Sequence, residues 1–143
     1  QLYNAGKKND CLYFKRLKEE TEHPSRIIVF PDTYSSDIQQ IIIKDAQMII
    51  GTRYHSIVFG INNRVPVIAL SYEHKIAGML EILGIKGRSF EFNTEASIHK
   101  FDFAKFEQVI TVNQPSRENL IDYADHAHGI AMSCFSEASQ LLQ

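Results

Sequence analysis

IIGTRYHS at residues 49–56 and VPVIALSYEHK at residues 65–75 each begin as an apolar run and end in polar or cationic residues. Each pattern predicts a buried strand that leads into the start of a helix. In an open α/β sheet, ligands bind at the carboxyl ends of the strands, because helix N-terminal N–H groups and nearby cations converge there. One anion-binding pocket at this edge is expected to be faced by Arg53, His55, His74 and Lys75.

The same alternation of strands and helices continues on both sides of this stretch. The run RIIVF at 26–30 predicts a buried parallel strand, because its β-branched residues do not alternate with polar ones. Ser36 and Gln39 have the spacing of a capping box, which would open a helix that runs through Ala46. Further helices are expected at 10–22, 54–62, 76–83, 98–110 and from 116 onward, and further strands at 47–50, from 66 and at 89–92. This order predicts right-handed crossovers and an α/β fold, a Rossmann-like parallel sheet flanked by helices.

Size and composition predict one domain. The chain has 143 residues, of which 44% are hydrophobic, enough for a single core over 1–143. With 15 basic and 17 acidic side chains, no overall field favours nucleic acid or an anionic membrane, so anion binding must be local. The chain begins with Gln1 rather than Met, which indicates a fragment or a processed product.

The cysteines and the hydropathy pattern favour a cytoplasmic protein. Cys11 and Cys134 lie near opposite ends of the chain with no CxxC spacing, which favours packing thiols in a reducing compartment. No stretch reaches the roughly 20 apolar residues that a membrane span needs, and no signal-like segment follows a basic start. We therefore expect no transmembrane segment.

The ordered set GTRYHS, VPVIALSY and Lys75 resembles the polysaccharide pyruvyl transferase family. Its members carry a strand, then Gly-Thr-Arg, an aromatic residue or Leu, His-Ser, a helix, Val-Pro-Val-Ile and finally Ser-Tyr-x-x-Lys. The resemblance covers roughly residues 27–85. It implies the carboxyl-terminal half of a two-domain, glycosyltransferase-B-like protein whose N-terminal half would precede Gln1, with the long C-terminal helix bracing a neighbouring domain.

The residues at the predicted edge suit anion binding and proton transfer. Arg53 offers a planar fork for a carboxylate or phosphate, although a surface arginine paired with a helix acid is the simpler alternative. His55 is suited to act as an acid or base near neutral pH, although a lone histidine is usually structural. Lys75 would place a point charge on a phosphate, and the hydroxyl of Tyr72 would bond a ligand or stay buried and satisfied.

The resemblance implies a transferase that moves the pyruvyl unit of phosphoenolpyruvate onto hydroxyls of a sugar in a surface or exopolysaccharide, with no cofactor. Arg53 would bind the donor, His55 would be the catalytic acid or base, and Lys75 would bind the phosphate of the donor. The acceptor would be a saccharide or a lipid-linked saccharide, reached at the inner face of the membrane. The expected substrate-binding residues are Gly51, Thr52, Arg53, Tyr54, His55, Ser56, Tyr72 and Lys75, with the ring of Tyr54 pointing away from Arg53 and His55.

Other readings of the sequence stay open. One alternative is a glycosyltransferase that uses a sugar nucleotide. The same cations would bind the diphosphate of the nucleotide, and Glu91 or Glu95 would bind its ribose. A non-catalytic Rossmann-like interaction module would use its long terminal helix as the interface. His126 and His128 lie two apart, so they do not share a helix face, and no metal site is expected there. The sequence has no GxGxxG, P-loop or Gly-x-Ser-x-Gly signature.

Overall fold

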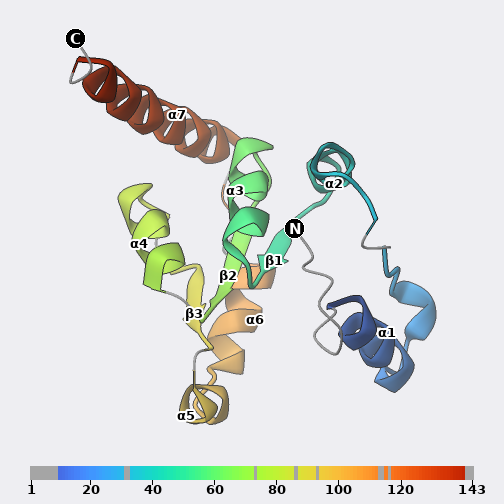
Figure 1. Cartoon of the computed structure of the whole chain (residues 1–143). Coiled ribbons are helices and arrows are strands. Elements are labelled where there is room, and N and C mark those ends of the chain that lie inside the picture. Colours follow the sequence, from blue (N-terminus) through green and yellow to red (C-terminus); the bar gives the residue numbers. More distant parts are fainter. Residues whose placement is uncertain are drawn as a thin grey trace. The chain divides into compact units, whose positions relative to one another are not determined.

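The computed structural model describes residues 10–30, 33–72, 74–85, 87–92, 94–112, 115 and 117–140 (Figure 1). The chain divides into two compact units, residues 1–41 and 42–143, and each is described by itself. The expectation of a single domain over 1–143, forming half of a larger protein, stays a prediction.

The first unit is built from short helices. Helix α1 (Asp10–Glu20) confirms the predicted helix, and η2 (Pro24–Arg26) is a single 3₁₀ turn that begins at the proline. The predicted strand at 26–30 is wrong: residues 27–30 have no regular structure, and Ile28 is 74% exposed. A β-branched run forms a strand only when a neighbouring strand pairs with it, and no described strand does so here.

Helix α2 (Ser36–Lys44) begins where it was predicted, but a different serine caps it. The Oγ of Ser35, not that of Ser36, accepts the backbone N–H of Ile38 at 3.5 Å. The side-chain amide of Gln39 donates to the carbonyl of Tyr34 at 2.8 Å. The predicted capping box is therefore wrong: the cap is Ser35, and Gln39 bonds to Tyr34 rather than to the backbone N–H of the cap.

The second unit is an α/β fold around a parallel sheet. Strands β1 (Ile49–Gly51), β2 (Val67–Ser71) and β3 (Ser89–Glu91) lie side by side in chain order among the described residues (Figure 1). The register pairs Gly51 with Ala69 and Ala69 with Ser89. Helix α3 (Tyr54–Asn62) follows β1, and α4 (His74–Ile82) follows β2. The predicted fold class, a parallel sheet flanked by helices, is confirmed.

Helices cover both faces of this sheet, and successive residues of β2 point to opposite sides. Val67 and Ala69 join a core with Ile57, Ile76 and Leu80, which come from α3 and α4. Ile68, which lies between them in β2, points to the opposite face and packs with Phe90 and with Val109 of α6 (Phe103–Thr111). Residues on both faces of β2 are therefore buried, as its continuous apolar run predicted.

The segment after β3 differs from the single helix predicted at 98–110. Two helices form instead, α5 (Glu95–His99) and α6, and they are separated by residues 100–102. The carboxylate of Asp102 accepts the N–H of Lys105 at 2.9 Å and so starts a new helix. Phe101 leaves the helical path and packs its ring 5.6 Å from that of Phe90.

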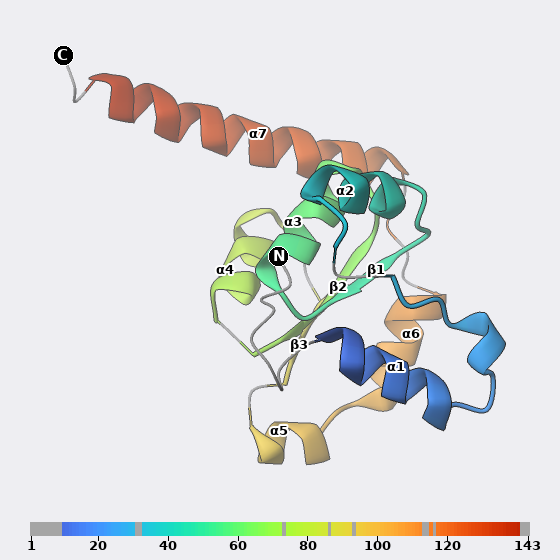
Figure 2. The ribbon, with the colours of Figure 1, turned by 45° about the vertical axis from the view of Figure 1, so that its right-hand side comes forward.

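Helix α7 (Arg117–Gln140) confirms the predicted long C-terminal helix. Its Tyr123 and Ala127 pack against the core formed by α3 and α4. Beyond this contact the helix extends past the rest of the second unit (Figure 2). Within the described residues, no helix combines the length and the apolar character that crossing a membrane requires.

Candidate functional site

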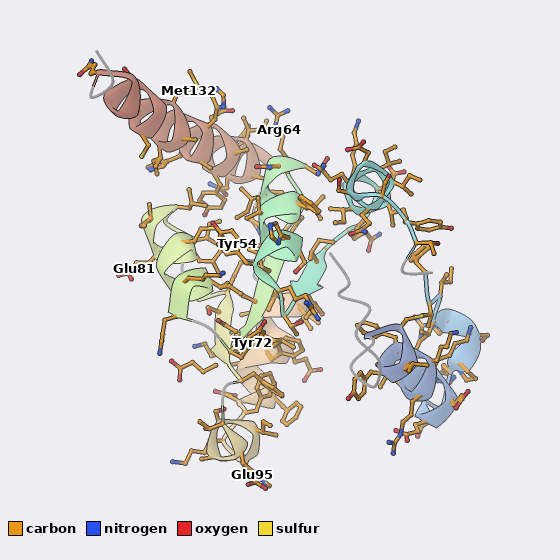
Figure 3. All side chains as sticks on the ribbon, viewed as in Figure 1. Tyr54, Arg64, Tyr72, Glu81, Glu95 and Met132 are labelled. Atoms are coloured by element: carbon orange, nitrogen blue, oxygen red, sulfur yellow. The ribbon has the colours of Figure 1, made fainter. Side chains whose placement is uncertain are left out.

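The candidate site lies at the carboxyl edge of the sheet, where two turns emerge side by side. Strands β1 and β2 are neighbours and parallel, so the turn from Gly51 into α3 and the turn from Ser71 into α4 start from the same edge. Figure 3 shows Tyr54 between α3 and α4 and Tyr72 beyond the end of β2. The backbone thus brings together the two segments on which the sequence placed the site.

Arg53 occupies the N-cap position of α3. Its backbone is extended, and its side chain makes no capping bond to the helix. Its carbonyl accepts the N–H of Ser56 at 3.1 Å and the hydroxyl of Ser56 at 2.6 Å. Thr52 and Arg53 are exposed, whereas the hydroxyl of Ser56 donates its hydrogen bond within the turn. The side chain of Arg53 is therefore exposed at the start of α3, and its contact with an anion stays a prediction.

Gly51 is required by packing within the chain. A Cβ at this position would meet the Oγ of Ser56 and would lie 2.8 Å from Cδ1 of Ile57. Ile57 is fully buried, so it cannot easily move aside. The glycine lets the first turn of α3 fold back against the end of β1, and this fixes where Arg53 and His55 are displayed.

His55 is exposed on the first turn of α3. Its ring lies 6.0 Å from the ring of Tyr54, edge to face, and 6.2 Å from the ring of Phe59. The expectation that the Tyr54 ring turns away from His55 is therefore wrong. These contacts orient the imidazole while one side of it stays open to solvent.

On the second turn, Ser71 is buried and Tyr72 is 52% exposed, so the hydroxyl of Tyr72 is not a buried, satisfied group. Lys75 places its Nζ 5.1 Å from the centroid of the Tyr54 ring, and this cation–π contact joins the two turns. Lys75 and Tyr54 also line a groove between helices, which Arg53, His55 and His74 do not line. A single pocket shared by all four cations stays a prediction.

The sequence model of the polysaccharide pyruvyl transferase family matches residues 3–74, about half of the chain. The chain belongs to the polysaccharide pyruvyl transferase family. The match includes the whole β1–α3 turn and ends at His74, the first residue of α4 and one residue before Lys75. It begins and ends earlier than the segment 27–85 that the sequence motifs indicated.

A relative in Erwinia amylovora, the amylovoran biosynthesis protein AmsJ, is 27% identical over 78 residues. The aligned segment spans 54% of this chain and 19% of the relative, so the match covers about a fifth of that protein's length. No solved structure matches the chain. The glycosyltransferase-B likeness that the family resemblance implied stays a prediction.

The sequence analysis missed one buried cation, Arg88. It is 6% exposed, and its Nη1 donates to the carbonyl of Val67 at 3.3 Å. It lines a small cavity with Tyr123 of α7. Burial lowers the pKa of Arg88, and the electrostatic interaction with Tyr123 opposes that shift. Because it precedes β3, Arg88 lies at the opposite edge of the sheet from the candidate site, where its role is structural.

The remaining candidates lie elsewhere in the second unit or outside it. Glu91 ends β3 at the same edge as the two turns, and Glu95 begins α5. His126 and His128 are exposed on α7, and within the described ranges no three His, Cys, Asp or Glu side chains are arranged to hold a metal ion. Cys11 and Cys134 are not joined by a disulfide.

Proposed function

We propose that this chain binds phosphoenolpyruvate at the carboxyl edge of its sheet and contributes to transferring the pyruvyl group to a sugar of a surface or exopolysaccharide. Membership of the polysaccharide pyruvyl transferase family supports the reaction class. The relative AmsJ is named for the biosynthesis of amylovoran, which supports an exopolysaccharide context. The observation that carries the proposal is the pair of adjacent turns bearing Arg53, His55, His74 and Lys75.

The donor has two anionic groups, and the two turns offer cations of matching kinds. The guanidinium of Arg53 can hold a carboxylate or phosphate through two parallel hydrogen bonds. Lys75 supplies a point charge that suits a phosphate oxygen. The first N–H groups of α3 add a positive dipole end close to Arg53. Phosphoenolpyruvate would therefore lie across the β1–α3 and β2–α4 turns.

His55 is the group proposed to move protons. A proton given to C3 of phosphoenolpyruvate makes C2 electrophilic, and a sugar hydroxyl adds to C2 and loses its own proton. Phosphate then leaves from C2, and a second hydroxyl closes the cyclic ketal with loss of its proton. An exposed imidazole beside Arg53 is suited to deliver the first proton and accept another. No cofactor enters these steps.

The parts of this reaction beyond the donor site belong to the proposal as well. The acceptor would be a saccharide or a lipid-linked saccharide, bound with the help of an N-terminal half of the same protein. A cytoplasmic location at the inner face of the membrane would bring the site to such an acceptor. Because the aligned segment is about a fifth of the relative's length, turnover is expected only from a longer protein, while donor binding is expected from this chain.

The test is an amide-resolved NMR titration of the chain with phosphoenolpyruvate, run beside inorganic phosphate and uridine diphosphate. Saturable shifts are expected at residues 51–56 and 72–75, with phosphoenolpyruvate preferred. Arg53→Ala should weaken binding by about tenfold or more, roughly 1.4 kcal/mol, because a charge-assisted contact is lost. Arg26→Ala removes an equal charge from an exposed arginine outside the two turns and should leave binding unchanged.

Each other outcome has a defined meaning. A preference for uridine diphosphate would replace the proposal with a sugar-nucleotide glycosyltransferase, whose ribose contact would be sought at Glu91 or Glu95. Equal weakening in Arg53→Ala and Arg26→Ala would show that general charge, rather than the candidate site, attracts the ligand. The absence of chemical-shift changes with all three ligands would contradict donor binding by this chain and favour an interaction module.

A further inference from the structure

A groove between helices α3, α4 and α7 shares Tyr54 and Lys75 with the candidate site, but its other lining residues have no part in the chemistry described above. Its volume is about 470 Å³, which falls in the range of pockets that bind small molecules. Its lining is mostly apolar and includes Val58 of α3, Ile82 of α4 and Ile130 of α7. We call it the interhelical groove. Helices α3 and α4, which line it, cover one face of the sheet (Figure 1).

The interhelical groove is polar at one end. Tyr54 is the first residue of α3 and Lys75 the second of α4, and both helices begin at the carboxyl edge of the sheet. Lys75 Nζ lies 5.1 Å from the Tyr54 ring centroid, so the charge and the aromatic ring are at the same end of the groove. Toward the other ends of the two helices and along α7, the lining is aliphatic except for Asn62, the last residue of α3. The groove therefore has a charged end and a mostly apolar length, which would match the charged head and the aliphatic chain of an amphiphilic ligand.

On the α4 side of the groove, Gly78 has no side chain to fill the space. Gly78 lies in the middle of α4, where a glycine weakens a helix relative to alanine. A Cβ built on Gly78 meets no atom within 4 Å, so no packing contact requires the glycine. Ile82, one turn later, is 65% exposed although it lines the groove. Open space beside an exposed isoleucine is suited to an aliphatic chain.

We propose that the interhelical groove binds the aliphatic chain of one amphiphilic anion. The chain would lie along Val58, Gly78 and Ile82, and the anionic head would meet Lys75 and the hydroxyl of Tyr54. This goes beyond donor binding, because phosphoenolpyruvate has no aliphatic chain to place. It also differs from adsorption to a bilayer, which uses clusters of basic residues on a surface, whereas this groove offers a concave lining and one lysine.

Decyl phosphate, used below its critical micelle concentration, is the probe. Calorimetry with the 143-residue chain should show one molecule bound per chain. Inorganic phosphate and decyltrimethylammonium, which lack the chain or reverse the charge, should bind at least about tenfold more weakly. Lys75→Met keeps the aliphatic stem and removes the charge, so it should weaken binding of decyl phosphate but not of decanol.

The decisive variant is Gly78→Leu, which fills the groove from a position with free space. It should lower the affinity for decyl phosphate at least about tenfold while the protein stays folded, as judged by its thermal unfolding. The matched control is Gly129→Leu, since Gly129 is also helical, also has open space above it and does not line the groove. That control should bind decyl phosphate like the wild type.

The two proposals fail separately. Gly78→Leu should keep the response to phosphoenolpyruvate, and Arg53→Ala should keep the affinity for decyl phosphate. Unchanged decyl phosphate binding in Gly78→Leu would overturn the groove proposal. So would binding to anionic phospholipid vesicles without binding of the monomeric probe, or a dimer in sedimentation that Gly78→Leu disrupts, since a second copy would then be the occupant.

Discussion

Single residues decide how the two turns of the site are displayed, and only part of this is visible in the sequence. The sequence predicted that Arg53 would come at the strand-to-helix junction, and it is the N-cap of α3. It predicted Ser36 as the cap of α2, whereas Ser35 is the cap, because the side chains of two consecutive serines are identical and only the backbone path distinguishes them. Arg88 could not be assigned a role, since its burial depends on Tyr123, which lies far away in the sequence.

Replacing Arg88 should separate the packing of its side chain from its charge. Arg88→Met keeps most of the volume, so the free energy of unfolding should fall by only about 1 kcal/mol or less. Arg88→Ala should cost about 2–4 kcal/mol, because it leaves a cavity beneath α7. Urea unfolding of both variants measures the difference. Equal losses would mean that the hydrogen bond to Val67, rather than packing, carries the effect of Arg88.

At the scale of elements, periodicity placed most helices and strands, and it failed where a neighbour decides the outcome. Helix α3 has the predicted bounds of 54–62, because its apolar positions repeat at helical spacing. The run at 26–30 has the composition of a strand but no described partner strand. The predicted helix 98–110 is broken by Asp102, whose side chain starts α6.

The packing of α3 on the sheet depends on Gly60. A Cβ there would collide with Cγ1 of Val67, a buried residue of β2. Gly60→Ala should therefore destabilise the protein by about 1–3 kcal/mol in urea unfolding, despite the better helix propensity of alanine. Gly78→Ala is the control, since its Cβ meets open space, and it should stabilise by about 0.5–1 kcal/mol.

The collision expected in Gly60→Ala is tested directly by removing the atom that the new methyl group would meet. Val67→Ala removes the Cγ1 atom that the new methyl would meet, so the double variant should lose less stability than the two single variants added together. Strict additivity would show that the helix is not held at this distance by the contact between Gly60 and Val67.

At the scale of the molecule, the sequence predicted the fold class and the edge of the sheet that carries the candidate site. It could not predict the interhelical groove, because three helices from separate parts of the chain form its walls. It also placed Lys75 with the anion-binding cations but not beside Tyr54, since that contact joins the starts of two different helices.

Helix α7 joins the end of the chain to the core through Tyr123 and Ala127. Tyr123→Ala should lower the free energy of unfolding by about 2 kcal/mol or more, because it removes an aromatic ring from the contact between α7 and the core. Met132→Ala changes a side chain that is 54% exposed, farther along the same helix, and should cost less than about 0.5 kcal/mol. Thermal or urea unfolding would measure both. Similar losses would contradict the idea that α7 is anchored only through its first half.

The sheet order β1-β2-β3 follows the order of the chain, and this has a consequence for folding kinetics. Each strand pairs with the next one in the sequence, at a separation of 18 residues from Ile49 to Val67 and 20 from Ala69 to Ser89. Closing such short loops costs little entropy, so every pairing can form as soon as its strand is available. We expect the sheet to assemble strand by strand during synthesis, before α7 emerges to pack against the core that α3 and α4 form.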